Sequence, residues 1–132
     1  MNAFIVEAKN QPGKLAETTK AIADKGVNIV TGTVIGIGQS GGFAFISNDE
    51  GGTRTALRDA NATFREVEVM PISVADEPGA LAKIAKKLAD AGVNIELVLP
   101  TGMSGNKMTL ALGVDKIDAA RKAIGAEVAT PA

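Results

Sequence analysis

The chain repeats itself at half its length. Residues 8–29 and 74–95 of the 132-residue sequence align without a gap and are identical at 11 of 22 positions. Pro12-Gly13 recurs as Pro78-Gly79, and the sequence Gly-Val-Asn-Ile at 26–29 recurs at 92–95, both 66 residues later. A repeat this long predicts two structural copies of one small unit. We expect a first domain at 1–68 and a second at 69–132.

Each copy begins with the pattern of a strand followed by a helix. The apolar positions of the two first strands alternate with polar ones and are Phe4, Val6, Ala8 and Met70, Ile72, Val74. The apolar face of the first helix is predicted at Leu15, Ala16, Ile22 and Ala23, and in the second copy at Leu81, Ile84, Ala85 and Leu88. Gly26 and Gly92 are predicted to end these helices in the left-handed conformation.

The second half of each copy predicts a hairpin, a shorter helix and a last strand. The expected hairpin strands are 30–37 and 43–47, with a turn at 39–42, and then 96–101 and 107–113, with a turn near 104–106. Helices follow at about 52–60 and 116–124. A last strand at 64–69 leads almost directly into the second copy, whose own last strand is a short piece near Glu127 to Thr130.

This order predicts the α+β fold class: two tandem ferredoxin-like βαββαβ units with antiparallel sheets and both helices on one face. A copy of about 65 residues buries only about 60% of its unfolded surface and is marginally stable alone. We therefore expect the copies to pack together and a further homodimer contact.

Missing residue types exclude much chemistry. The sequence has no His, Cys, Trp or Tyr, so it has no Ser-His-Asp or Cys-His nucleophile, no thiolate metal site and no disulfide. The expectation is a protein that is not an enzyme, with no catalytic residue, metal site or cofactor. A net charge of −1 favours neither nucleic acid nor membrane as a partner. Without a signal peptide or a long apolar segment, a cytoplasmic location is expected.

One segment matches a dinucleotide-binding pattern. Residues 36–41 read Gly-Ile-Gly-Gln-Ser-Gly, which fits G-x-G-x-x-G. That pattern binds a dinucleotide only where it opens a helix, whereas residues 42–46 read as another strand. The segment is therefore predicted to be a hairpin.

The segments that join the first strand to the first helix resemble the ACT family. They read Asn10-Gln11-Pro12-Gly13-Lys14-Leu15 and Asp76-Glu77-Pro78-Gly79-Ala80-Leu81, and each helix is followed by Gly-Val-Asn-Ile. ACT domains are small regulatory modules that pair through sheets or helices and bind amino acids at the interface between copies. The resemblance covers nearly the whole chain and implies a stand-alone tandem ACT protein.

An amino acid would find suitable groups at these segments. Unpaired N–H groups at a helix N-terminus stabilise a carboxylate, and Gly13 or Gly79 lets a ligand approach the backbone. Asn10 or Asp76 can cap the helix or accept a hydrogen bond from an ammonium group. The ligand-binding residues that the resemblance implies are Asn10, Gln11, Pro12, Gly13, Lys14, Leu15, Asn28, Ile29, Asp76, Glu77, Pro78, Gly79, Ala80, Leu81, Asn94 and Ile95.

The same residues also have a purely structural reading. An Asx residue, Pro and Gly occur before many helices that bind nothing. The two segments differ besides, because Asn10 and Gln11 are neutral whereas Asp76 and Glu77 can pair with an ammonium group. We expect unequal sites, and if only one binds, the second.

Three function classes follow. The first is a regulator that binds a small ligand, an amino acid, at inter-domain interfaces near these segments. The alternative is an adaptor that recruits a partner enzyme without any ligand. An RNA-binding module ranks last, because the stacking aromatic residues and the basic charge it needs are missing.

Overall fold

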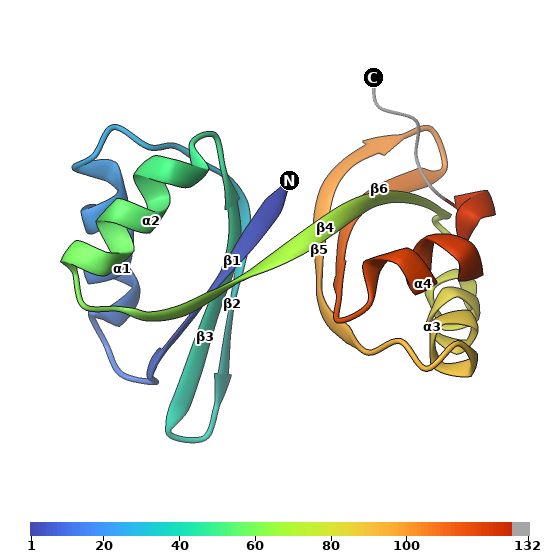
Figure 1. Cartoon of the computed structure of the whole chain (residues 1–132), viewed down its shortest axis with the longest axis horizontal. Coiled ribbons are helices and arrows are strands. Elements are labelled where there is room, and N and C mark those ends of the chain that lie inside the picture. Colours follow the sequence, from blue (N-terminus) through green and yellow to red (C-terminus); the bar gives the residue numbers. More distant parts are fainter. Residues whose placement is uncertain (128–132) are drawn as a thin grey trace. The chain divides into compact units, whose positions relative to one another are not determined.

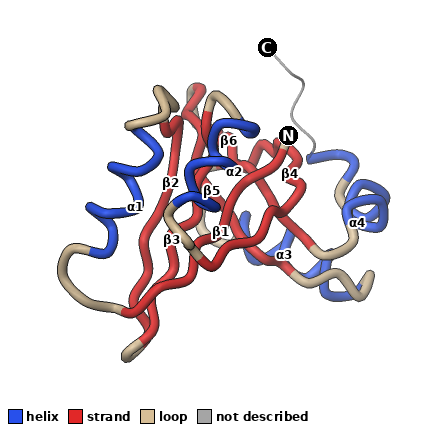
Figure 2. The backbone as a smooth tube through the Cα atoms, turned by 60° about the vertical axis from the view of Figure 1, so that its left-hand side comes forward, coloured by secondary structure: helices blue, strands red, loops and turns tan. Residues whose placement is uncertain are grey.

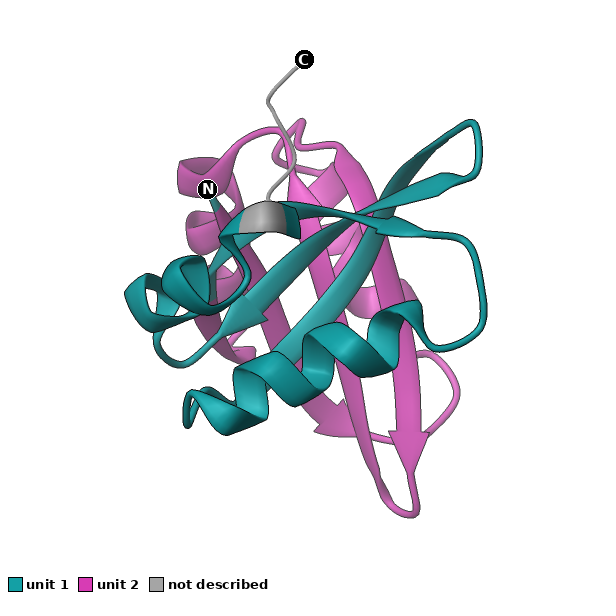
Figure 3. Cartoon of the chain, turned by 90° about the vertical axis from the view of Figure 1, so that its right-hand side faces the viewer, with its two compact units in different colours: residues 1, 67–132 teal, residues 2–66 magenta. Residues whose placement is uncertain are grey.

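The chain consists of α-helices and antiparallel β-strands. The computed structural model describes residues 1–127 (Figure 1), and the backbone tube alternates between strands and helices along its length (Figure 2). It divides into two compact units, which we call the N-terminal unit, Asn2–Glu66, and the C-terminal unit, from Val67 onward together with Met1 (units 2 and 1 in Figure 3). Within residues 1–127 no helix is long and apolar enough to cross a bilayer.

The N-terminal unit has two helices on one face of its strands (Figure 1). Its elements are β1 (Asn2–Lys9), α1 (Lys14–Ala23), β2 (Ile29–Ile37), β3 (Ser40–Ser47), α2 (Glu50–Asp59) and the first residues of β4 (Thr63–Ala75). The hydrogen-bonded strand order is β2-β3-β1-β4, so β2 is an outer strand. Phe4 of β1 lies opposite Phe45 of β3, and Phe43 lies opposite Val34 of β2.

The C-terminal unit repeats most of this arrangement. Its elements are the rest of β4, α3 (Ala80–Asp90), β5 (Ile95–Ser104), β6 (Lys107–Val114), α4 (Ile117–Ala123) and a 3₁₀ helix (Gly125–Glu127), with strand order β4-β6-β5. The expected strand near Glu127 to Thr130 begins inside the 3₁₀ helix, and its other residues lie outside the described part of the chain. The separate strands expected at 64–69 and 70–74 are one strand, β4.

Each unit has its own hydrophobic core between strands and helices. In the N-terminal unit Phe4, Ile22 and Leu57 are fully buried, and the rings of Phe4 and Phe45 stack with centroids 5.7 Å apart. The core of the C-terminal unit contains the buried side chains Met70, Ile72, Ile84, Leu88, Leu112, Ala120 and Ile124. The predicted alternation is therefore confirmed at Phe4 and Val6 and at Met70, Ile72 and Val74, whereas Ala8 is only partly buried and Ala3 is buried as well.

Two leucines that were predicted to lie in the core are on the surface. Leu15 is 44% exposed and Leu81 is 49% exposed, whereas Ile22, Ile84 and Leu88 are buried. Both leucines belong to the first turn of their helix, which lies where the strand-to-helix segment ends. Ala16 and Ala23, which were also predicted for the apolar face of the first helix, are exposed as well, so only Ile22 of that predicted set is buried. In the second copy the prediction holds for Ile84 and Leu88, and Ala85 is partly buried. The helical period alone does not tell which turns are covered by the sheet.

The hairpins are tighter than predicted. Strand β3 begins at Ser40, so the first turn is Gly38-Gln39 rather than 39–42, and the second is Gly105-Asn106. Gly38 and Gly105 have φ of 61° and 62°, the left-handed conformation that two-residue hairpin turns favour. The G-x-G-x-x-G segment is therefore a hairpin, as predicted.

The second helices also differ slightly from their predicted bounds. Helix α2 begins at Glu50, two residues early, because the carboxylate of Asp49 accepts a hydrogen bond from the N–H of Gly52 at 2.9 Å. This side-chain cap satisfies one of the first-turn donors of the helix.

Candidate functional site

The two strand-to-helix segments enter their helices with the same backbone conformation. Gly13 and Gly79 are the N-cap residues of α1 and α3, with φ of 93° and 87°. Neither helix start has a side-chain cap hydrogen bond, so the capping role suggested for Asn10 and Asp76 is wrong. The first-turn N–H groups therefore have no side-chain acceptor, and such donors attract anions.

Asn10 is held by the hairpin of its own unit instead. Its backbone N–H donates to the carbonyl of Gln39 at 2.9 Å, and its Nδ2 donates to the carbonyl of Gly38 at 3.0 Å. The side chain lies over Gly36, where an added Cβ would be 2.6 Å from Nδ2. In the C-terminal unit the backbone N–H of Asp76 donates to the carbonyl of Asn106 at 2.6 Å. Both segments are thus attached to a hairpin tip.

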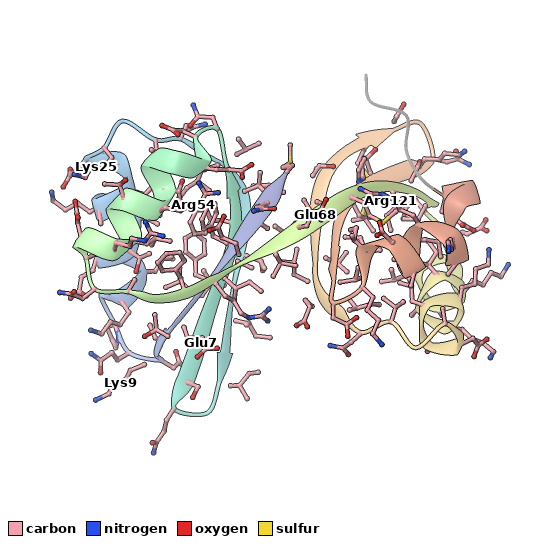
Figure 4. The ribbon with its side chains drawn as sticks, in the orientation of Figure 1. Glu7, Lys9, Lys25, Arg54, Glu68 and Arg121 are labelled. Atoms are coloured by element: carbon pink, nitrogen blue, oxygen red, sulfur yellow. The ribbon has the colours of Figure 1, made fainter. Side chains whose placement is uncertain are left out.

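A small cleft lies between the first segment and the sheet. Four predicted residues line it: Asn10, Gln11, Lys14 and Leu15. The other lining residues include Val34 of β2, Phe43 of β3 and Lys9, which is at the end of β1 and is labelled in Figure 4. The volume of the cleft, about 90 Å³, is far below the roughly 300–1,000 Å³ of sites that enclose a drug-sized ligand. One copy of the cleft can hold only a small group.

The charges of the two segments are opposite in sign. Lys9 and Lys14 flank the first segment, and the repeat places Ala75 and Ala80 at the matching positions. The second segment instead carries Asp76 and Glu77. The amine of Lys14 lies 3.5 Å from the carboxylate of Glu17 in an exposed ion pair, which leaves it partly available to a ligand. The first segment suits a carboxylate group and the second an ammonium group.

The second segment borders a wider groove of about 560 Å³ in the C-terminal unit. Glu77 and Ala80 of the predicted set line it, together with Lys83 and Lys87 of α3. The amine of Lys87 is 2.7 Å from the carboxylate of Glu127. The other predicted residues of this segment, Asp76, Pro78, Gly79 and Leu81, are exposed.

Four predicted residues lie away from the segments. Asn28 and Ile29 follow the C-terminal end of α1, and Asn94 and Ile95 follow that of α3. A ten-residue helix is about 15 Å long, so within one copy these residues are at the opposite end from the segment. Asn28 and Asn94 instead use their backbone N–H groups, which donate to the side chains of Asn48 and Asp115 at 2.9 and 2.8 Å.

Several lining residues were not predicted. Val34, Phe43 and Thr18 border the first cleft, and Gly36 makes room for Asn10. The strand pairing that brings Val34 and Phe43 to this place is long-range, so only the glycines of the hairpin gave a local signal. Among residues 1–127 no group of three acidic side chains could hold a metal ion.

An ion pair with two hydrogen bonds lies outside the cleft. Arg54 of α2 (Figure 4) donates two hydrogen bonds of 2.7 Å to the carboxylate of Glu66, which also accepts one from the side chain of Asn2 at 3.1 Å. These bonds, above all those from Arg54, lower the pKa of Glu66 below its ordinary value. They tie α2 to β1 and β4, which are neighbouring strands of the sheet.

No protein-family model matches the sequence, and no curated protein matches it at a significant level. Solved structures do resemble the chain. A protein from Bacteroides thetaiotaomicron aligns with a TM-score of 0.74 and 23% identity, over 95% of this chain and 86% of the other. The regulatory subunit of aspartate kinase from Thermus thermophilus, in its ligand-free form, aligns with a TM-score of 0.62 and 20% identity, over 96% and 91%. The regulatory subunit of aspartate kinase from Thermus flavus aligns with a TM-score of 0.63 and 18% identity, over 95% of this chain and 91% of the other.

At sequence identities of 18% to 23%, the similarity to these structures shows a shared fold. The chain is similar over nearly its full length to regulatory subunits of aspartate kinase, and these neighbours confirm the expected resemblance to ACT-domain proteins at the level of the fold.

Proposed function

We propose that this chain is a cytoplasmic regulatory protein of the tandem ACT type, with modules at 1–68 and 69–132, that binds an amino acid and catalyses no reaction. The observation that carries the proposal is the cleft at Asn10, Gln11, Lys14 and Leu15, in a chain that has the fold of aspartate kinase regulatory subunits. Its lysines and open helix start suit a carboxylate, and its apolar wall suits a side chain.

The exposed leucines support this reading. A leucine that is about half exposed at the same position of both copies does not contribute fully to the core. At the mouth of the cleft, Leu15 would instead cover the apolar part of a ligand. We propose Asn28, Ile29, Asn94 and Ile95 as residues that reach a ligand only from another copy, because within one copy they are too far from the segment.

A thermal-shift screen of the full chain against the twenty amino acids tests the proposal. A ligand present at 100 times its Kd adds about 2.7 kcal/mol to the free energy of unfolding, which raises Tm by several degrees. One amino acid or a few related ones are expected to give a saturable shift. A flat response to all twenty would instead favour the adaptor that recruits an enzyme without a ligand.

Substitutions that exchange residues between the copies then locate the site. Asp76→Asn gives the second segment the asparagine that the first segment has at position 10. Because the variant cannot form an ion pair with the ammonium group of the ligand, its binding is expected to be about tenfold weaker. Lys14→Ala gives the first segment the residue of the second and weakens the carboxylate contact. Lys25→Ala is the control, because Lys25 pairs with Asp59 at 3.0 Å, away from the cleft.

Titration calorimetry distinguishes the two segments. If only one segment binds, the second is the expected site, and Asp76→Asn should then cost more affinity than Asn10→Ala. The opposite result, with affinity abolished by Asn10→Ala and untouched by Asp76→Asn, would contradict this assignment.

A further inference from the structure

The two units differ at the edge of their first strand. In the N-terminal unit β1 lies between β3 and β4, so a strand is paired with it on each side. In the C-terminal unit residues 69–75 of β4 take the place of β1 and pair with β6. On their other side the N–H of Val69 donates to the carbonyl of Met1 at 3.0 Å, and β1 continues from Met1 alongside the earlier residues of β4, where Asn2 contacts Glu66. Within residues 1–127 no strand therefore pairs with the open side of residues 70–75.

The backbone of this open edge can accept another strand. In a regular antiparallel ladder, successive residues direct their N–H and C=O groups to opposite sides. Val69 is directed to Met1, so Pro71, Ser73 and Ala75 are directed to the open edge. Pro71 has no N–H and leaves no donor there, whereas Ser73 presents both an N–H and a carbonyl. A strand placed beside Ser73 would be held by main-chain hydrogen bonds, as in other complexes in which a peptide extends a sheet.

A groove of about 560 Å³ lies at this edge. Its lining includes Ser73 and Lys83, and the repeat-matched residues Glu7 and Glu17 line a smaller groove of about 340 Å³ in the N-terminal unit. The smaller groove is also lined by residues 60–63, through which the chain enters β4. The larger groove is thus the position that β4 occupies in the other copy, left open by the described residues of the C-terminal unit.

The groove presents apolar, basic and acidic groups to an occupant. Val74 and Ile84, both buried members of the core, form part of its lining and suit an apolar side chain. Lys83 lines it as well, and no carboxylate among the described residues pairs with its amine. One oxygen of Glu127, Oε1, pairs with Lys87, but the other, Oε2, is buried without a hydrogen-bond partner in the described part of the chain. Because an unsatisfied buried acceptor is costly, an occupant that brings a donor is favoured.

We propose that this groove binds an extended segment of a partner protein, which pairs with the edge of β4 as a fourth strand of the C-terminal unit. The N-terminal unit shows the kind of segment that fits, because its own β4 packs Phe64 against the core and continues with Arg65 and Glu66. A segment of this type brings an apolar side chain to the apolar lining, an acidic side chain to Lys83 and a donor to Glu127.

A peptide with the sequence of the N-terminal unit's own strand tests the proposal. The probe is fluorescein-labelled Asn-Ala-Thr-Phe-Arg-Glu-Val-Glu, residues 61–68 of this chain. Fluorescence polarisation with the full chain, in a buffer without amino acids, is expected to show saturable binding at one site. The same peptide carrying Phe64→Pro should lose this binding, because proline removes both a main-chain donor and the apolar side chain.

Substitutions in the groove locate the binding. Lys83→Glu replaces attraction for an acidic side chain by repulsion and should raise the dissociation constant of the peptide roughly fivefold. Ala80→Phe should also raise it, because Ala80 lines the groove and the larger side chain fills it. Lys122→Glu is the control and should leave the constant within about a factor of two, because Lys122 of α4 is exposed and does not line the groove. Circular dichroism and Tm check that each variant folds, and Lys83→Glu decides alone if Ala80→Phe does not.

Three results would overturn the proposal. They are a wild-type chain that does not bind the peptide, equal effects of Lys83→Glu and Lys122→Glu, and binding that appears only once residues 128–132 are removed. The last result would assign the groove to the chain itself. The inference does not rest on the proposed amino-acid site, so a flat response in the amino-acid screen has no bearing on these outcomes.

Discussion

The side-chain amide of Asn10 donates a hydrogen bond to the carbonyl of Gly38, 3.0 Å away and 28 residues later in the sequence. This bond fixes the strand-to-helix segment against the β2–β3 hairpin, and the cleft lies between the two. The hydrogen bond requires a glycine at position 36, because the side chain of Asn10 lies directly over Gly36.

Substituting Gly36 by alanine should displace Asn10. The new Cβ would lie 2.6 Å from Nδ2, so the flexible amide must move and release Gly38. In the NMR spectrum of the ¹⁵N-labelled chain we expect a large shift of the Asn10 side-chain NH₂ signals. Gly102→Ala is the matched control, because nothing lies within 4 Å of its added Cβ. An unchanged Asn10 signal in Gly36→Ala would contradict the arrangement.

The ion pair of Arg54 and Glu66 predicts a dependence of stability on pH. The folded-state pKa of Glu66 is lower than its unfolded value near 4.5. The contribution of Glu66 is therefore fully present above that value and is lost as the pH falls through the folded pKa. Urea unfolding of the wild-type chain should show this loss, and Glu66→Gln should be less stable at neutral pH with a smaller change on acidification.

Glu68→Gln is the control for that measurement. Glu68 is on the same strand, but its carboxylate is 3.9 Å from Arg121 and half exposed, so the pair contributes little. Equal effects of the two substitutions would show that the two hydrogen bonds of Arg54 do not stabilise the fold.

Two leucines on helix α3 should differ in their effect on stability. Leu88 is fully buried and Leu81 is 49% exposed. Leu88→Ala leaves a cavity in the core of the C-terminal unit and should lower the free energy of unfolding by about 2–5 kcal/mol. Leu81→Ala should cost less than about 1 kcal/mol, because water already reaches most of that side chain. Urea unfolding of both variants checks the difference, and equal losses would place Leu81 in the core.

Local sequence patterns predicted which helices and strands form better than they predicted the residues at which each begins and ends. Alternation and helical periods located β1, α1 and α3, and the glycines located both hairpins. The turn was misplaced because Gly41 and Gly42 suggested a loop, whereas they pair with Ala8 and Glu7 of β1. Pairing with a third strand is a long-range effect that turn-forming residues do not reveal.

Of the residues that form the candidate site, the sequence predicted only those of the strand-to-helix segment itself. Asn10 to Leu15 were identified from their own segment, which the repeat made visible. Val34 and Phe43 were missed because their place depends on the register between β2, β3 and β1. The capping role of Asn10 was wrong because the hairpin carbonyl of Gly38 competes for its side chain.

Strand β4 runs for 13 residues, Thr63–Ala75, and carries the end of one unit and the beginning of the next without a turn between them. A duplicated protein is usually dissected by cutting a linker, and this chain has no linker at that boundary. A half-chain that ended at Glu66 would lack the later part of a strand, and one that began at Val67 would lack the earlier part. Two separately produced halves must therefore both contain Thr63–Ala75, and they will overlap in sequence by the length of this strand.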